Sequence, residues 1–416
     1  MTSTSCSQLA RDLLARAIAG ESPAELPPAL LAEPGGQSLF GILAEGLADR
    51  FEPALCDVYA RLFAQAIDPA NSAALIARYR RIREPRPIAG EPRTVFVLSR
   101  VTLGADVAVT SVLLDAAKRR FPQAQIVFVG PPKNYELFAA DPRIAHAAVA
   151  YRRGSLLERL SVRQELETLL AARDSVVIDS DSRLTQLGLL PVGPEDRYHL
   201  FESRGYGGSS DASLPQLAAR WAAETFDVEG ARPYVALADA PAHRGAIAVS
   251  LGVGENPAKR LPDPFEENLL AMLAPQAMLA PQALLASQAL PAGTKATLVI
   301  DKGAGGEEAA RVERAAARSG VQAAFWDGSF AGFAAIIAAA RLYVGYDSAG
   351  QHVAAAAGVP LISVFAGFPS PRMFDRWRPT GDCASVIRVD HPDPADAIAR
   401  VRDRLHPSAP PASGRR

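Results

Sequence analysis

The stretch RLYVGYDSAGQHVAAAAGVPLISVFAG (residues 341–367) decides the fold class of this chain. It begins with the short apolar run RLYVGYDS (341–348), passes into the alanine-rich QHVAAAAG, and continues with the apolar run PLISVFAG (360–367). Gly358 and Pro360 stand where a helix between the two runs would end. A strand, a helix and a second strand in this order predict one unit of a parallel α/β sheet.

The same rhythm extends toward the N-terminus. GAIAVSLG (245–252) and ATLVIDKG (296–303) predict further strands of the same half. A separate series begins at TVFVLS (94–99) and runs through QIVFVG (125–130) and DSVVIDS (174–180). We therefore predict an α/β protein with two Rossmann-like domains that face a cleft. Ligands in such sheets bind at the carboxyl ends of the strands.

Residues 1–90 follow a helical pattern instead. Leu9, Leu13 and Ile18 recur at helical spacing, and the proline-rich EPRPIAGEPR (84–93) separates this segment from the first strand. The predicted divisions of the chain are a helical N-terminal segment (1–90), a first Rossmann-like domain (91–240), a second one (241–392), and a C-terminal helix with a disordered tail (393–416).

Two stretches carry no predicted chemistry. AMLAPQAMLAPQALLASQAL (271–290) is an imperfect six-residue repeat, interpreted as a low-complexity expansion of a surface helix or loop. The tail HPSAPPASGRR (406–416) is expected to be disordered because it offers few apolar residues to a core.

The composition is that of an ordinary globular protein, with 416 residues, 49% of them hydrophobic and 21% charged. The net charge of −1 gives no broad electrostatic footprint for nucleic acid. Cys6, Cys56 and Cys383 form neither a CxxC metal motif nor a disulfide framework, which is typical of a reducing cytosol. No long apolar segment is present, so we expect a cytoplasmic protein without a signal peptide or membrane span.

Polar side chains gather where the strand of the opening stretch becomes a helix. Asp347, Ser348 and His352 surround this turn, and the first amides of the helix make an anion site together with the helix dipole. Ala349 and Gly350 leave room for a phosphate to approach the backbone. The alternative is structural: Ser348 or Asp347 caps the helix and His352 packs as a polar residue.

Two further loops of the second half could bind a nucleotide. In SLGVGENPAKRLP (250–262), Ser250 opens a small-residue loop, and Lys259 suits a diphosphate, although the spacing is not that of a Walker A motif. After the next strand, Glu307 and Glu308 begin a helix. A carboxylate there either holds the hydroxyls of a ribose or simply favours the helix dipole. Lys259 could equally lie on a solvent-exposed loop.

Asp106 follows the first strand of the first half, in SRVTLGADVAVTS (99–111). It either begins the next helix or serves as a general base that accepts the proton of a hydroxyl nucleophile. Taken alone, the pattern favours the helix start. The stretch does not supply the GxGxxG of a Rossmann dehydrogenase, and the chain has no GxSxG of an α/β hydrolase.

Together these features resemble the heptosyltransferase family, glycosyltransferase family nine of the GT-B fold, over roughly residues 94–390. The matches to the family's C-terminal segment are Asp347, Ser348, His352, Ala354, Ala355, Ala356, Gly358, Pro360, Phe365 and Gly367. The matches to its early segment are Arg100, Gly104, Asp106, Phe121, Pro122, Ala124 and Ile126. The chain departs from the family in having Ala349 where glycine is usual, Leu261 in place of tryptophan after Lys259, and one extra residue before Asp106.

The resemblance implies transfer of a sugar from a nucleotide-diphospho-sugar, ADP-heptose in the best-known members, to a lipopolysaccharide core acceptor. It implies inversion at the anomeric carbon and no tightly bound metal or cofactor. The partners would be the nucleotide-sugar donor and a glycan or lipid-linked acceptor, reached in the cytoplasm or at the inner membrane surface.

Residue roles follow from the same resemblance. Asp106 is the implied general base. The implied donor-binding residues are Ser250, Lys259, Glu308 (or Glu307), Asp347, Ser348, Ala349, Gly350 and His352. Arg100 and Arg183 are the implied acceptor-binding residues.

Two other functions remain open from the sequence. One is a GT-B transferase with a different donor and a protein or exopolysaccharide acceptor. The other is a nucleotide-sugar-binding scaffold without catalysis, in which residues 1–90 bind a partner. RMFDRWRP (372–379) could contact an anionic acceptor or a membrane, but we expect Trp377 to pack and the arginines to face solvent.

Overall fold

The computed structural model describes residues 5–254, 256–278 and 297–406. The chain forms two compact units. The first unit comprises Met1–Ala236 and Pro369–Trp377, and the second comprises Leu237–Phe368 and Arg378–Arg416. Most of the predicted repeat and nearly all of the tail lie outside the described residues.

A parallel sheet of five strands forms the centre of the first unit, in the order β3-β2-β1-β4-β5. Its strands are β1 (Thr94–Leu98), β2 (Gln125–Gly130), β3 (Ile144–Ala148), β4 (Ser175–Asp179) and β5 (Tyr198–Leu200). The strand order reverses direction between β1 and β4, where Leu98 lies opposite Asp179. Ligand crevices in open α/β sheets form at such a reversal.

One face of this sheet is covered by helices that follow its strands. The chain leaves β1 through α6 (Leu103–Ala105) and the π-helical turn η3 (Asp106–Thr110), and then enters α7 (Ser111–Arg120). α7 packs against β1 and β2, and α11 (Leu214–Phe226) packs against α7. The helix predicted after the first strand is therefore present, with a wider first turn.

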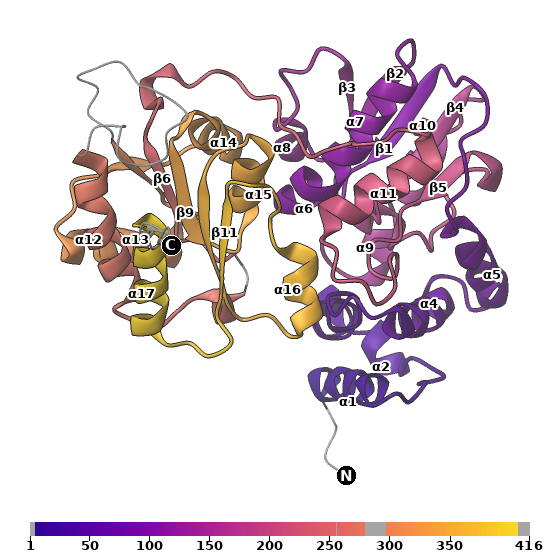
Figure 1. Ribbon diagram of the computed structural model, residues 1–416. Helices are drawn as coiled ribbons and strands as arrows, with labels where there is room; N and C mark the ends of the chain where they lie inside the picture. The colour runs from indigo at the N-terminus through magenta and orange to yellow at the C-terminus, as the bar shows by residue number, and fades with distance from the viewer. Residues whose placement is uncertain (1–4, 255, 279–296, 407–416) are drawn as a thin grey trace, which may run out of the picture. The chain divides into compact units, whose positions relative to one another are not determined.

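The N-terminal helices cover the opposite face. They are α1 (Cys6–Ile18), α2 (Pro28–Leu31), η2 (Ser38–Ala44), α3 (Glu45–Ala48), α4 (Pro53–Ile67) and α5 (Ser72–Ile82). Phe63 of α4 is fully buried and stacks on Tyr59 with ring centroids 4.3 Å apart. Figure 1 shows α1, α2, α4 and α5 lying together in indigo. The N-terminal helices share one hydrophobic core with Phe96 and Leu98 of β1. The expected N-terminal helical segment is thus part of the first unit's core.

The second unit contains a parallel sheet of six strands in the order β11-β10-β9-β6-β7-β8. Its strands are β6 (Ile247–Ser250), β7 (Leu298–Asp301), β8 (Ala324–Trp326), β9 (Leu342–Tyr346), β10 (Leu361–Phe365) and β11 (Ala384–Arg388). The order reverses between β6 and β9, where Ser250 pairs with Gly345. This is the strand order of a dinucleotide-binding fold, and its ligand crevice is expected at the β6/β9 reversal.

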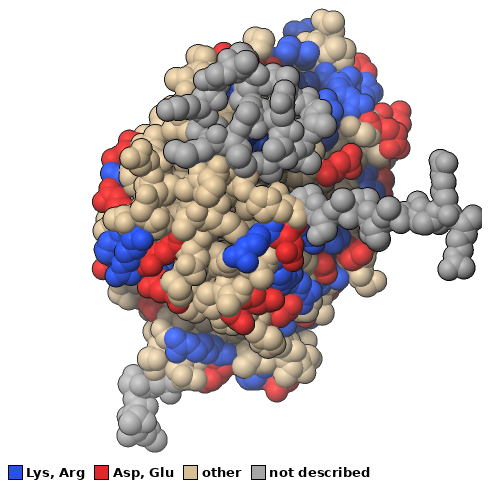
Figure 2. All heavy atoms as spheres, turned by 60° about the vertical axis from the view of Figure 1, so that its left-hand side comes forward, with Lys and Arg blue, Asp and Glu red and all other residues tan. Residues whose placement is uncertain are grey.

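Helices lie on both faces of this second sheet. The helices α12 (Phe265–Met278), α13 (Gly306–Ser319) and α17 (Pro394–Leu405) share a core with β6, β7, β9 and β10. The helix α15 (Ala349–Ala356) packs against β9, β10 and α14 (Phe330–Ala339). The predicted α/β fold with two Rossmann-like sheets is confirmed. Lys and Arg are interspersed with Asp and Glu on the face shown in Figure 2.

None of the helices in the described ranges combines the length and the apolar character needed to cross a membrane.

Candidate functional site

The carboxyl ends of β6 and β9 bring together several of the predicted donor-binding residues in the second unit. Ser250 is the last residue of β6, and Asp347 and Ser348 directly follow β9. Because the two strands are adjacent and parallel, their ends share one edge of the sheet. The structure therefore gathers these residues at the strand reversal, where a Rossmann-like sheet binds its ligand.

Lys259 reaches this edge from the loop after β6. Its Nζ lies 2.7 Å from Oδ2 of Asp347 and donates to the Asp347 carbonyl oxygen at 3.3 Å. The side chains are 20% and 6% exposed, so the pair is largely shielded from water. Although Pro257 and Ala258 of this loop are exposed, the Lys259 side chain turns away from solvent and its charge is held at the turn that precedes α15.

The missing side chain of Gly367 lets the loop of Lys259 pack closely against the backbone that follows β10. Its φ is +67°, and a Cβ added there would lie 2.3 Å from the backbone carbon of Ala258 and 2.7 Å from the nitrogen of Lys259. Real Cβ atoms do not approach backbone this closely, so only glycine fits. A glycine after β10 thereby fixes the position of the lysine.

A buried hydrogen-bond network holds Asp347 from the other side. Gln351 donates its side-chain amide to Oδ1 of Asp347 and accepts a hydrogen bond from Ser363. His352 is buried beside this network, and burial lowers its pKa to about 4, with Lys259 lowering it further and Asp347 opposing the shift. The imidazole is therefore neutral at physiological pH. Gln351, which departs from the family pattern before His352, orients the Asp347 carboxylate, a contact that the sequence did not predict.

Ser348 does not cap α15, although it occupies the N-cap position. Its side chain makes no capping hydrogen bond and instead lies 3.2 Å from the Tyr343 hydroxyl. Asp347 is engaged by Lys259 and Gln351. The alternative in which Ser348 or Asp347 closes the helix start is therefore disfavoured, and the first amides are left for another acceptor.

Gly350 has a packing role. A Cβ at this position would lie 2.4 Å from the hydroxyl oxygen of Tyr343, so the glycine accommodates the Tyr343 side chain. Its role in leaving room for a phosphate stays a prediction. Ala349, the first residue of α15, is half-buried at the helix start.

Glu308 lies against the loops that follow β6 and β7. A Cβ on Gly252 or Gly303 would come within 2.3 or 2.5 Å of its Oε1, so both glycines make room for this carboxylate. Burial raises the pKa of nearby Asp301 to about 6; the charge of Glu308 adds to the shift, and a hydrogen bond from Gly303 opposes it. Glu307 is exposed, so Glu308 is the better placed of the two predicted residues.

Asp106 in the first unit is fully buried. Its carboxylate accepts hydrogen bonds from Ser99 Oγ (2.7 Å), Arg100 N (2.7 Å), Thr110 Oγ1 (2.6 Å) and Asn134 Nδ2 (2.6 Å). Burial raises the pKa of this carboxyl, and the hydrogen bonds oppose that shift. Asp106 therefore ties the loop after β1 to the helical turn that follows it. Its role as a base stays a prediction.

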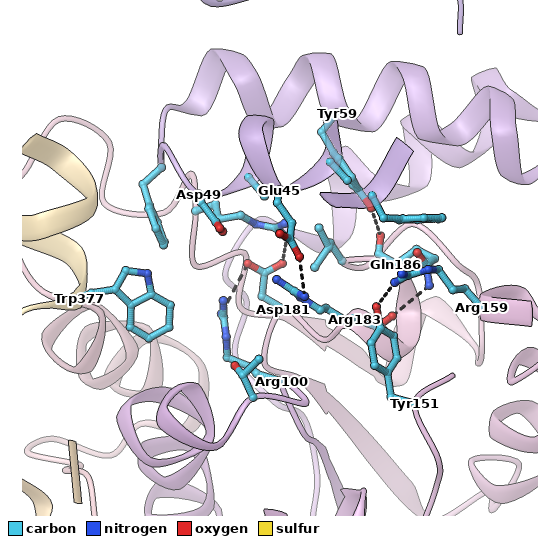
Figure 3. Close-up of a pocket in the computed structure, with 17 residues that line it drawn as sticks. Glu45, Asp49, Tyr59, Arg100, Tyr151, Arg159, Asp181, Arg183, Gln186 and Trp377 are labelled. Atoms are coloured by element: carbon cyan, nitrogen blue, oxygen red, sulfur yellow. Dashed lines mark hydrogen bonds and ion pairs between the residues drawn. The ribbon is translucent and has the colours of Figure 1, made fainter. Parts of the chain in front are cut away.

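Arg100 and Arg183 both line a pocket in the first unit, at the reversal between β1 and β4 (Figure 3). The pocket encloses about 680 Å³, part of it open to solvent. The other lining residues are Phe40, Ala44, Glu45, Ala48, Asp49, Phe51, Tyr59, Thr102, Tyr151, Arg159, Asp181, Gln186, Leu187, Arg204 and Trp377. The wall opposite the sheet thus comes from the N-terminal helices.

A buried ion network forms the floor of this pocket. Asp181 has no exposed surface and pairs with Arg204, and its Oδ2 lies 3.6 Å from Nη1 of Arg100. Ser203 donates to the same carboxylate oxygen at 2.7 Å. Nearer the rim, Arg183 Nη1 lies 3.1 Å from Oε1 of Glu45. The sequence offered one signal for Asp181, its place directly after a buried strand.

Trp377 reaches the pocket from α16 (Pro371–Trp377). The guanidinium carbon of Arg100 lies 5.9 Å from its ring centroid, and Phe51 meets the ring edge-on at 6.1 Å. Arg376 is fully buried and donates to the carbonyl oxygens of Ser210 (2.9 Å) and Ala212. The expectation that the arginines of this helix face solvent is therefore wrong for Arg376, because it anchors α16 to a neighbouring loop.

No group of three or more His, Cys, Asp and Glu side chains in the described part of the chain is arranged to hold a metal ion.

Comparison with known families identifies the C-terminal part. Residues 285–400 match the model of glycosyltransferase family 9 (heptosyltransferase). This part of the chain is similar to the family 9 glycosyltransferases. The match includes Glu308 and the whole turn from Asp347 to His352, and so confirms the resemblance that those residues carried. A comparison with curated proteins gives no match.

Solved structures show that the fold extends beyond the family 9 match. A family 9 glycosyltransferase from Veillonella parvula is similar with a TM-score of 0.53 and 14% identity, over 76% of this chain and 90% of that one. E. coli heptosyltransferase WaaC with ADP is similar with a TM-score of 0.51 and 18% identity, over 75% of this chain and 99% of that one. WaaC with ADP-2-deoxy-2-fluoro heptose has a TM-score of 0.51 and 17% identity, over 75% of this chain and 99% of that one. Both sheets thus belong to a GT-B glycosyltransferase fold.

Proposed function

We propose that this protein transfers a sugar from a nucleotide-diphospho-sugar to a glycan acceptor, and that the second unit binds the donor. The observation that carries the proposal is the Lys259–Asp347 pair beside the uncapped start of α15, at the β6/β9 reversal. A shielded cation and free helix amides at one sheet edge suit a diphosphate.

These groups would act on the leaving group. When the bond between the anomeric carbon and the diphosphate breaks, negative charge grows on the diphosphate oxygens. Lys259 and the amides of Ala349 and Gly350 would stabilise that charge, and fixed donors contribute most where charge develops in the transition state. Asp347 and Gln351 would keep Lys259 in place.

The remaining donor contacts follow from the positions of the side chains. Glu308 would accept hydrogen bonds from the ribose hydroxyls, because it lies at the ends of β6 and β7. Ser348 and neutral His352 would hydrogen-bond the phosphates or the transferred sugar. The E. coli heptosyltransferase WaaC binds ADP and an ADP-heptose analogue, so we propose an ADP-heptose type of donor.

Asp106 would receive the proton of the acceptor hydroxyl as that oxygen attacks the anomeric carbon, with inversion. Since its carboxylate is already hydrogen-bonded by Ser99 and Thr110, the base must act after the loop of Ser99 shifts or through one of those hydroxyls. Arg100 and Arg183 would contact the acceptor, a lipopolysaccharide-type or lipid-linked glycan.

Donor binding tests this proposal directly. Thermal unfolding is measured with ADP-, GDP-, UDP- and dTDP-sugars, since a ligand that binds only the native state raises the unfolding temperature. We expect a shift with the ADP-sugar that is lost in Lys259→Met. Lys118→Met is the matched control, because Lys118 forms an ion pair of similar burial with Asp141 in the first unit. No shift with any nucleotide sugar would overturn the proposal.

A different donor with a protein or exopolysaccharide acceptor is the second candidate. The observation that favours it is the wall that the N-terminal helices add to the pocket of Arg100 and Arg183. A thermal shift with a GDP-, UDP- or dTDP-sugar, and none with an ADP-sugar, would select this candidate. A scaffold without catalysis would bind a donor but would not transfer or hydrolyse it in any assay.

A further inference from the structure

The pocket of the first unit carries backbone strain that a purely structural cavity does not require. Six non-glycine residues in the described ranges have positive φ, and four of them, Phe51, Asp181, Gln186 and Leu187, line this pocket. A fifth, the β-branched Val101 at φ 73°, lies between lining residues Arg100 and Thr102. Such positions are strained, and backbone strain of this kind concentrates at ligand sites.

A buried donor in the same pocket lacks a partner. Arg204 is 4% exposed, its guanidinium pairs with Asp181, and its Nε finds no hydrogen-bond acceptor among the described residues. A buried N–H without a partner is costly, and nearly all such groups in native proteins are satisfied by protein, water or ligand. The Arg204 guanidinium thus adds a fixed positive charge to the floor of the pocket.

The rim of the pocket carries a hydrogen-bond acceptor, in contrast to the donors of the floor. The half-buried carboxylate of Asp49 makes no hydrogen bond or close ion pair with any described residue, while Glu45 is held by Arg183 (Figure 3). Carboxylates only accept hydrogen bonds and guanidinium groups only donate them. A ligand that suits both must donate and accept, as hydroxyl groups do. The rim thus places the acceptor oxygens of Asp49 near the donors of Arg100 and Arg183.

Aromatic side chains complete the lining. Trp377 and Phe51 meet edge-on at one end of the pocket, and Tyr59 and Phe40 contribute further rings. Binding pockets typically combine apolar and aromatic walls with a few oriented polar groups. The apolar C–H faces of a sugar ring pack against such rings, while its hydroxyls reach the charged side chains.

We propose that η2, α3, the loop of Asp49 and Phe51, and Tyr59 of α4 form a specificity-determining wall of a sugar-binding site. In this site Asp49 accepts hydrogen bonds from the hydroxyls of the acceptor ring. The wall is fixed in place, because Arg372 of α16 donates to the carbonyl oxygen of Phe51 and Arg50 donates to that of Pro369 at 3.4 Å. The identification of this sugar as the acceptor rests on the proposed transferase function. The wall lies outside the family 9 match, as do all residues of the first unit before Pro369.

The test measures sugar binding to the full-length protein. Saturation-transfer NMR is recorded with a panel of methyl hexosides, heptosides and hexuronides, and with inorganic phosphate as a competitor. We expect at least one glycoside to bind the parent and to resist displacement by phosphate. Asp49→Asn should weaken its binding about tenfold, because a charge-assisted hydrogen bond is lost. Asp12→Asn, an exposed change on α1, should leave binding unaltered.

ADP affinity is measured on the same samples, so the two proposals can fail separately. ADP binding without any glycoside binding overturns the sugar site and leaves the transferase standing. Glycoside binding that depends on Asp49, without ADP binding, supports the sugar site and removes the acceptor assignment. Glycoside binding unchanged by Asp49→Asn, or abolished by phosphate, overturns the role of the wall.

Discussion

Single residues set the geometry of the donor site, and Gly367 is the clearest case. Gly367→Ala would force a Cβ into the backbone of Ala258, at a φ that alanine disfavours. We expect a loss of about 1–3 kcal/mol in the free energy of unfolding, together with weaker ADP binding as Lys259 moves. Urea unfolding and calorimetric titration measure the two effects.

Gly320→Ala separates the clash from the backbone conformation. Gly320 has nearly the same φ, +68°, but a Cβ there meets nothing within 4 Å. This variant should lose about 1 kcal/mol or less and bind ADP normally. Equal effects of the two substitutions on ADP affinity would show that Gly367 does not position Lys259.

Glu202 gives the first unit a pH dependence. It is 6% exposed, accepts a hydrogen bond from Tyr79 at 2.5 Å, and burial raises its pKa to about 7. The folded state holds this proton more tightly than the unfolded chain does. The contribution of Glu202 to the free energy of unfolding is therefore fully present below about pH 4.5 and is lost as pH rises through 7. The loss amounts to roughly 3 kcal/mol of that free energy.

Glu202→Gln isolates this contribution, because the amide keeps an oxygen for Tyr79 but cannot ionise. Urea unfolding at pH 5 and pH 8 should show the variant to be more stable than the parent at pH 8, with little difference at pH 5. A parent and variant that respond identically to pH would place the charge of Glu202 in a solvated environment.

At the scale of elements, the N-terminal helices and the first sheet share one core. Phe63→Ala in α4 removes a fully buried ring and should cost about 3–5 kcal/mol. Because Phe96 and Leu98 belong to the same core, hydrogen exchange of the β1 amides should quicken along with that of α4. Leu157→Ala, at a side chain that is 80% exposed, is the control. Faster exchange confined to α4 would contradict a common core.

The strands also show what a sequence pattern can predict. Each strand expected from an apolar run lies in the interior of its sheet, whereas β3, β5, β8 and β11, which were not expected, are the four edge strands. An interior parallel strand is buried on both faces and reads as a continuous apolar run. β8 and β11 are largely half-buried, so no such run marks them.

The same argument separates the two sites. Ser250, Asp347 and Ser348 directly follow interior strands, so their convergence was predictable. The pocket of the first unit combines side chains from η2, α3, α4, α9 (Leu156–Leu160), α16 and the loops that follow α3, β1, β3, β4 and β5. No local sequence pattern predicts that these segments meet. Asp49 and Trp377 are 328 positions apart in the chain, since 377 − 49 = 328.

At the scale of the whole molecule, the two units have separate hydrophobic cores. We therefore expect two transitions in calorimetric unfolding, and ADP should raise only the transition of the second unit. Lys259→Met should abolish that shift and leave the other transition unchanged. A single transition that moves as a whole with ADP would show that the units unfold as one.

The position of α16 in the chain has a consequence for synthesis. This helix belongs to the first unit, yet it stands in the sequence between β10 and β11 of the second. A ribosome makes nearly the entire polypeptide before residues 371–377 become available. Although N-terminal domains generally fold first during translation, this one has to wait for Trp377 and Arg376. Until these residues are synthesised, the nascent first unit lacks the Trp377 side of its pocket. A chain terminated before residue 371 would never complete that pocket.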